Sequence, residues 1–373
     1  RTEGVVALSS RNIAETGNPL DPRWGDNLQV HRPAGTFWVQ AVAVSLLGKD
    51  GFTNISVYRL PSYLASVLAV VLIYALGRGL FGARPALLAA LAVGVTPIVA
   101  LQAQLAIAEP LILPLIVTSQ FALFGVYAAT GEPRWLGWRG AFWVALGIST
   151  WFNALAAPLL ALVTVLGLII ADRSARLLWR LAPWYGLPLF AIFALPWLIS
   201  FWLINGGRPF AGFDWRQALD ILEGGQEMKF KAVHGVFVLF VALACIPVSH
   251  MLGPALAQAW SARRQLATRF LLVWFIAPIV ALEICSNKPP LYTVQVVSPA
   301  VALLVAMALT GRFGAGRAFT AWPGFFTAAS LFVLIAVPLF AGGLLWLTGT
   351  PPPLAIIIGG GAIIALFVVA GWA

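Results

Sequence analysis

Long apolar stretches separated by short polar loops recur along this sequence, and they constrain the fold more than any other feature. A helix needs about 20 mostly apolar residues to cross the hydrocarbon core of a bilayer. Nine stretches come near or exceed that length, at residues 57–80, 84–101, 106–129, 183–204, 235–256, 269–285, 290–310, 321–347 and 354–373. A mean hydropathy of +0.91 excludes an ordinary soluble domain. We therefore expect an all-α integral membrane protein.

The apolar run at 140–171 is too long for one crossing and short for two. Arg134 and Arg139 precede the run and Arg173 follows it. Because arginine and lysine concentrate in cytoplasmic loops, both ends of the run are expected on the same side of the membrane. We therefore predict two crossings with a break near Asn153–Pro158, which brings the total to about eleven spans.

Charge is distributed unequally between the two sets of loops that this topology creates. One set carries twelve cations against only Glu132 and Asp172, and the other carries eleven cations and eleven acids. The cations of the first set are Arg78, Arg84, Arg134, Arg139, Arg173, Arg176, Arg180, Arg263, Arg264, Arg269, Arg312 and Arg317. The first set should be cytoplasmic, so the net charge of +10 reflects orientation rather than nucleic-acid binding. We expect a multi-pass membrane protein whose second set of loops lies outside, in the periplasm or its equivalent.

The first 56 residues are expected to lie outside the membrane but against it. Glu3 to Glu15 has the apolar spacing of a helix, and Thr16-Gly17-Asn18-Pro19 ends it. Ala34 to Leu47 is apolar but too short to span, which favours a second helix in the interface.

Three parts follow from this organisation. They are an external segment at 1–56 with two interfacial helices, a transmembrane core at 57–310 with an external loop at 205–234, and C-terminal transmembrane helices at 311–373. Because the chain begins with Arg1 and stops inside an apolar run, we expect it to be a piece of a longer protein.

Short motifs occur in a fixed order on the side that we expect to be external. In chain order they are Thr2-Glu3-Gly4, Ala14-Glu-Thr-Gly-Asn-Pro-Leu-Asp-Pro22, His31-Arg32-Pro33-Ala34 before Phe37-Trp38, Tyr58-Arg59-Leu60-Pro61, Ala106-Ile-Ala-Glu109, Ala194-Leu-Pro-Trp197 and Lys288-Pro-Pro-Leu-Tyr292. Their order and placement resemble the family 39 glycosyltransferases of the GT-C fold, over nearly all of residues 1–310. That family includes bacterial aminoarabinose transferases of lipid A and protein O-mannosyltransferases.

The resemblance implies transfer of a sugar from a polyprenyl-phosphate-linked donor to an extracytoplasmic lipid, glycan or protein. Such a reaction needs a cation at the leaving phosphate, whose charge grows as the bond to the sugar breaks. Arginine binds phosphate oxygens through its planar fork, so Arg32 is the first candidate and Lys288 the second. The resemblance adds Tyr292, His234 and Arg59 to the donor phosphate site. The alternatives are a cation that reaches lipid headgroups for Arg32 and a place in the aromatic belt for Tyr292.

A general base should accept the proton of the acceptor hydroxyl. Thr2 stands where the family usually has its catalytic aspartate, so Glu3 and Glu109 are the catalytic candidates. Glu3 would otherwise be a first-turn glutamate that favours the helix dipole. Glu109, followed by Pro110, could instead bind a metal or the sugar. Glu283 is a weaker third acid.

A divalent metal is possible but no two ligands show metal-type spacing. His31 is the first candidate ligand, with Asp26 or His234 to complete the set. His31 could equally hydrogen-bond phosphate or sugar, or be a plain turn residue.

A second function stays open beside the transferase. Because Thr2 replaces the aspartate, the chain could be a degenerate homologue that binds lipid phosphate as a subunit of a membrane complex. A transporter is disfavoured, since the acids gather on one side rather than at the bilayer midplane.

Overall fold

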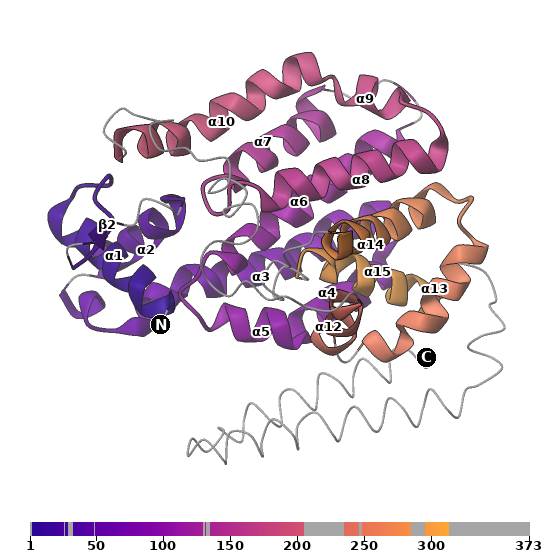
Figure 1. The fold of residues 1–373 in the computed structure, drawn as a ribbon. Helices are drawn as coiled ribbons and strands as arrows, with labels where there is room; N and C mark the ends of the chain where they lie inside the picture. Colours follow the sequence, from indigo (N-terminus) through magenta and orange to yellow (C-terminus); the bar gives the residue numbers. More distant parts are fainter. Residues whose placement is uncertain are drawn as a thin grey trace, which may run out of the picture.

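The computed structural model describes residues 2–25, 27–28, 33–47, 49–129, 131, 135–204, 235–245, 248–284 and 295–312. It consists of a helical bundle with a small helical layer at one end (Figure 1). The elements are α1 (Thr2–Thr16), β1 (Arg23–Trp24), β2 (Asn27–Leu28), α2 (Gly35–Leu47), η1 (Lys49–Phe52), α3 (Ile55–Leu80), α4 (Ala83–Val95), α5 (Pro97–Ala103), α6 (Glu109–Ala128), η2 (Trp135–Arg139), α7 (Gly140–Ser149), α8 (Ala156–Asp172), α9 (Arg176–Leu181), α10 (Pro183–Ile204), α12 (Val236–Ala244), η3 (Ser249–Met251), α13 (Leu252–Ser261), α14 (Leu266–Ile284) and α15 (Ser298–Leu309).

Of the described helices, four are long and apolar enough to cross a bilayer: α3, α6, α10 and α14. The pair α4 and α5 would make a fifth as one broken span, bent by 59°. The bend falls at Thr96, which is extended and precedes Pro97, as expected where proline disfavours a helical conformation in the residue before it. These helices agree with an integral membrane protein, and the total of about eleven spans stays a prediction.

The apolar run at 140–171 is broken where the sequence predicted. Helix α7 ends at Ser149 and α8 begins at Ala156. The side chain of Asn153 accepts hydrogen bonds from the backbone N–H groups of Leu155 and Ala156, at 3.1 and 3.0 Å. These two donors have no partner inside a helix, so Asn153 stabilises the start of α8.

The stretch at 235–256, predicted as one span, is not a continuous helix. It is divided among α12, the short turn η3 and the start of α13. Pro254 lies in the first turn of α13, where its missing N–H leaves no intrahelical hydrogen bond unmade. The proline therefore marks the start of a new helix inside a stretch whose composition is apolar throughout.

Helix α6 lies at the centre of the bundle, whereas α10 lies at its margin. In α6, 83% of the membrane-length window is buried, against 17% in α10. Around α6, Phe81 stacks on Phe124 with ring centroids 4.9 Å apart, and Phe121 meets the buried Trp274 edge-on. The outward side chains of α10 are mostly apolar and exposed, which suits a surface that faces lipid.

The two N-terminal helices match their predicted ranges and pack against each other. Val6 and Ile13 of α1 share a small core with Phe37 and Ala41 of α2. A two-residue antiparallel ribbon, β1 with β2, connects the helices and was not predicted. Its turn begins at a glycine in the left-handed region, Gly25 (φ 59°), a conformation open mainly to glycine.

Arginine side chains hold the opposite end of the bundle together. Arg180 donates to the carbonyls of Tyr127, at 3.1 Å, and of Ala129, at the carboxyl end of α6. Arg139 donates to the backbone carbonyl of Arg180, and Arg269 pairs with Asp172 at the end of α8. We call this region the arginine end. In Figure 1, α1 and α2 lie at one side of the molecule and α9 and α13 at the other.

Candidate active site

The carboxylate of Glu3 joins three elements at the end of the bundle that carries α1. Arg59 on α3 donates to it twice, from Nε to Oε1 at 2.7 Å and from Nη2 to Oε2 at 3.1 Å. The backbone N–H of Ala106, in the loop between α5 and α6, donates to the same Oε1 at 3.0 Å. Glu3 therefore holds α1 against α3 and against the α5–α6 loop.

These hydrogen bonds change what Glu3 can do chemically. The hydrogen bond from Arg59 lowers the pKa of Glu3 below its ordinary value of 4.5, although partial burial acts in the opposite direction. A general base works best when its pKa lies near the working pH, so a lowered pKa weakens Glu3 in that role. Arg59 was predicted to bind the donor phosphate, but in the structure it pairs with the carboxylate of Glu3. The sequence did not predict this partner.

The Glu3 contact should be sensitive to acid. Because its pKa is lower in the folded state, the contact contributes its full stability above about pH 4.5 and loses it as the pH falls through the lowered pKa. We expect hydrogen exchange of the α1 amides, corrected for intrinsic rates, to accelerate as the pH falls below about 4.5. Glu3→Gln should abolish that dependence, and an unchanged dependence in this variant would assign the effect to another group.

Glu109 is the first residue of α6 and lies at the same end, three residues after Ala106. It is half-buried. The start of a helix favours a negative charge, because the first backbone N–H groups point toward it. Gln295, in the turn that leads into α15, donates from Nε2 to the backbone carbonyl of Glu109 at 3.4 Å. Gln295, far along the chain, thus contacts the start of α6.

The N-terminal layer, made of α1 and α2, packs through α2 against the segment between α7 and α8. The backbone N–H of Gly35 donates to the carbonyl of Trp151 at 2.9 Å, and the rings of Trp38 and Trp151 meet edge-on at 6.0 Å. Trp151 in turn donates from Nε1 to the carbonyl of Phe193 on α10 at 2.7 Å. The break therefore lies at the α1 end, while Arg139 before α7 and Asp172 at the end of α8 lie at the arginine end.

Gly35→Ala is expected to weaken this docking. A Cβ at position 35 would lie 2.5 Å from the carbonyl oxygen of Trp151, closer than real Cβ contacts come. We expect a loss of about 1–3 kcal/mol in the stability of the docked α2, measured as faster hydrogen exchange of its amides. Gly4→Ala is the matched control, because nothing lies within 4 Å of a Cβ at that position in α1. Equal effects from both substitutions would contradict the steric argument.

Glu283, the third acid considered from sequence, has a structural partner in the described residues. Its carboxylate accepts hydrogen bonds from the backbone N–H groups of Gly235, at 3.0 Å, and Phe237, at 2.8 Å. These groups open α12, so Glu283 stabilises the start of that helix from the end of α14. The sequence analysis did not identify Trp151 as a residue that joins α2 to α10. Its position just before the predicted break near Asn153 was the available signal.

The remaining predicted site residues lie outside the described residues. They are Arg32, Lys288, Tyr292 and His234 of the phosphate site, and His31 and Asp26 of the possible metal site. Within the part of the chain that the structure describes, no three His, Cys, Asp or Glu side chains form a potential metal site. The metal site stays a prediction.

Sequence comparisons find relatives that transfer sugars. Residues 31–200 match the family model described as dolichyl-phosphate-mannose-protein mannosyltransferase. The undecaprenyl phosphate-alpha-4-amino-4-deoxy-L-arabinose arabinosyl transferase 1 of Pseudomonas fluorescens is 27% identical over 319 residues, which cover 84% of this chain and 56% of the relative. The corresponding transferase of Pseudomonas aeruginosa is 27% identical over 320 residues with the same coverage. The chain thus spans about half the length of the curated relatives it matches.

Solved structures give the same fold. ArnT from Cupriavidus metallidurans bound to undecaprenyl phosphate superposes with a TM-score of 0.73 at 19% identity, covering 100% of this chain and 71% of that chain. The archaeal oligosaccharyltransferase AglB from Archaeoglobus fulgidus, in complex with an inhibitory peptide and a dolichol-phosphate, gives 0.54 at 13% identity, covering 99% and 51%. The chain therefore has the fold of the GT-C glycosyltransferases and resembles their aminoarabinose and protein mannosyl transferase members.

Proposed function

We propose that this chain carries the membrane part of a glycosyltransferase that moves a sugar from a polyprenyl-phosphate-linked donor to an extracytoplasmic acceptor. The acceptor is a lipid, a glycan or a protein. One observation carries the proposal: the likeness to ArnT bound to undecaprenyl phosphate extends over the whole chain, and the sequence relatives are named for a sugar carried on that lipid.

We place the donor phosphate between Arg32 and Lys288, with Tyr292 and His234 as further contacts. Support comes from the arginines at this end. Each of the three arginine side chains that the structure describes there already pairs with a carboxylate, in the pairs Arg11–Glu15, Arg23–Asp21 and Arg59–Glu3. A leaving phosphate needs a cation that is not neutralised in this way.

Glu109 is our candidate for the general base, and Glu3 with Arg59 forms a positioning pair. Glu109 lies at the bundle end to which Glu3 fixes α1, and it is the first residue of α6. Glu109 is also half-buried at the start of a membrane-length helix. Placing an acid at such a depth costs free energy, and acids found there usually have a function.

The α1 end faces the periplasm of a bacterial inner membrane and the arginine end faces the cytoplasm in this proposal. The positive-inside rule supports the orientation. About eleven spans complete the topology, of which α7 and α8 form one pair that returns to the arginine end.

A catalytically degenerate, lipid-phosphate-binding subunit is the second candidate. It is favoured by Thr2 in the place of the usual aspartate and by the engagement of Glu3 with Arg59.

Native mass spectrometry of the protein in mild detergent, with undecaprenyl phosphate added, tests the proposal. We expect one retained lipid, and we expect Arg32→Ala to release it. Release of undecaprenyl phosphate from added undecaprenyl-phosphate-aminoarabinose would then show turnover. Retention without turnover, for this and other lipid-linked sugars, would support the degenerate subunit, and no retained lipid would overturn both functions.

A further inference from the structure

A cluster of exposed aromatic side chains marks the corner where α9 meets α10, at the arginine end. Trp179, Trp184 and Tyr185 are 71%, 51% and 65% exposed. Their rings form a continuous group, with centroids 5.5 Å apart between the two tryptophans and 6.4 Å apart between Trp184 and Tyr185. Exposed tryptophan and tyrosine in membrane proteins gather at the level of the lipid headgroups.

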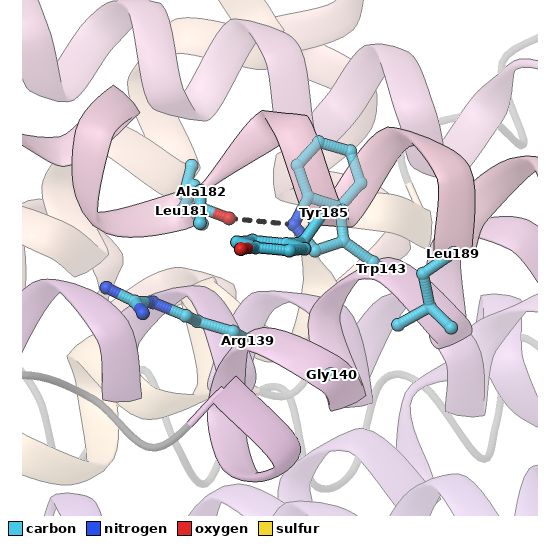
Figure 2. A pocket seen from close by; sticks show the side chains of 8 residues that line it. Arg139, Gly140, Trp143, Leu181, Ala182, Tyr185 and Leu189 are labelled. Atoms are coloured by element: carbon cyan, nitrogen blue, oxygen red, sulfur yellow. Dashed lines mark hydrogen bonds between the residues drawn. The ribbon is translucent and has the colours of Figure 1, made fainter.

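A shallow recess lies beside this cluster, between α7 and α10; its enclosed volume is about 10 Å³, and the rest of it is open. It is lined by Arg139, Gly140, Trp143, Leu181, Ala182, Tyr185, Gly186 and Leu189. Figure 2 shows the guanidinium of Arg139 and the side chain of Leu189 at opposite ends of this recess, with Tyr185 between them. The exposed lining of the recess is almost wholly apolar and the guanidinium of Arg139 lies at one end of it, so a cation borders an apolar groove, which is the polarity of a phospholipid.

The floor of the recess is held in place by its own contacts. The indole of Trp143 donates from Nε1 to the carbonyl of Leu181 at 2.9 Å, which fixes the orientation of the ring (Figure 2). Gly186 makes room for that ring, because a Cβ at this position would collide with the indole. The shape therefore follows from α7 and α10 themselves.

Positive charge exceeds negative charge at this corner. Arg173 and Arg176 are exposed beside it, and Arg139 makes one hydrogen bond among the described residues, from Nε to the carbonyl of Arg180. Asp172, the acid that the structure describes there, already pairs with Arg269. An anionic group at the rim would therefore meet cations that retain N–H donors.

We propose that the recess between α7 and α10 binds an anionic phospholipid. Its headgroup phosphate lies between Arg139 and Tyr185, and one acyl chain passes Leu189 along the exposed apolar side of α10, which includes Leu187 and Ile192. The site is distinct from the proposed donor site, because it lies at the arginine end rather than at the end that carries Glu3 and Glu109. It does not depend on sugar transfer.

Native mass spectrometry with added phosphatidylglycerol or phosphatidylcholine tests this site. We expect the protein to retain phosphatidylglycerol in preference to phosphatidylcholine. Arg139→Gln should weaken that retention about fivefold, because one arginine near an anionic lipid surface contributes on the order of a factor of five in affinity. Tyr185→Ala should weaken it as well, and this side chain is exposed enough for the variant to fold. Arg264→Gln is the matched control, because Arg264 is exposed at the same end but does not line the recess.

Several outcomes would overturn the site. Equal retention of the two lipids would show that charge plays no part. An effect of Arg264→Gln as large as that of Arg139→Gln would show a general attraction to the arginine end. Displacement of the lipid by millimolar inorganic phosphate would show that the recess recognises free phosphate rather than a phospholipid. If Arg139→Gln fails to fold, unchanged retention in Tyr185→Ala alone contradicts the proposal.

Discussion

Glu109→Gln is expected to lower the rate of sugar transfer by about 100- to 10,000-fold, the range that a positioned general base contributes. The glutamine keeps the size and the helix-start position of the side chain but cannot accept a proton. Binding of undecaprenyl phosphate should not change, because in the proposed site Arg32 and Lys288 bind the phosphate and Glu109 does not. The measurement is turnover of undecaprenyl-phosphate-aminoarabinose beside lipid retention in native mass spectrometry.

Glu283→Gln serves as the control for this variant. Glu283 is another acid at the membrane end of a helix, but its carboxylate accepts the first N–H groups of α12. Its replacement should lower thermal stability and leave turnover per folded molecule unchanged. If Glu109→Gln keeps full turnover while Glu3→Gln loses it, the base is Glu3 despite its lowered pKa.

Glu3→Ala is expected to free α1 from the bundle. The substitution removes two hydrogen bonds from Arg59 and one from Ala106, and it leaves a partly buried guanidinium without its carboxylate. Because hydrogen bonds to charged groups contribute more than neutral ones, we expect a loss of about 2–3 kcal/mol in the local stability of α1. Hydrogen exchange of the α1 amides measures this local opening.

The matched control is Glu15→Ala in the same helix. Glu15 pairs with Arg11 at 2.6 Å, but both side chains are more than 40% exposed, so solvent screens the pair and the loss should be much smaller than for Glu3→Ala. Arg59→Lys should fall between the two, since lysine keeps the charge but not the planar fork. Similar losses for Glu3→Ala and Glu15→Ala would show that Glu3 does not hold α1 in place.

Local patterns were enough to predict the helices of the N-terminal layer and the break in the long apolar run. Thr16-Gly17-Asn18-Pro19 stops a helix through its own backbone preferences, and α1 does end at Thr16. Asn153 caps the start of α8 through a contact three residues away in sequence. Both features are decided by neighbours in the chain, which sequence reasoning can see.

The pairing of Glu3 with Arg59 could not be predicted in the same way. The two residues are 56 positions apart, and each had a plausible separate role when taken alone. A polar residue at a membrane surface carries no sequence pattern that distinguishes a phosphate ligand from half of an ion pair. The division of the 235–256 stretch was missed for a different reason. Its composition is apolar throughout, so the helix start at Pro254 was not recognised.

The central position of α6 has a consequence for how the protein responds to bilayer thickness. Its carboxyl end is bound by Arg180 and its first turn is held by Gln295. The helix has 20 residues and is about 30 Å long, close to the thickness of the hydrocarbon core. Hydrophobic mismatch acts on helices that touch lipid, and among the four membrane-length helices α10, α3 and α14 are far less buried than α6. The depth of Glu109 is therefore set by the protein's own packing, and a thinner or thicker membrane tilts the outer helices while the acid keeps its distance from the arginine end.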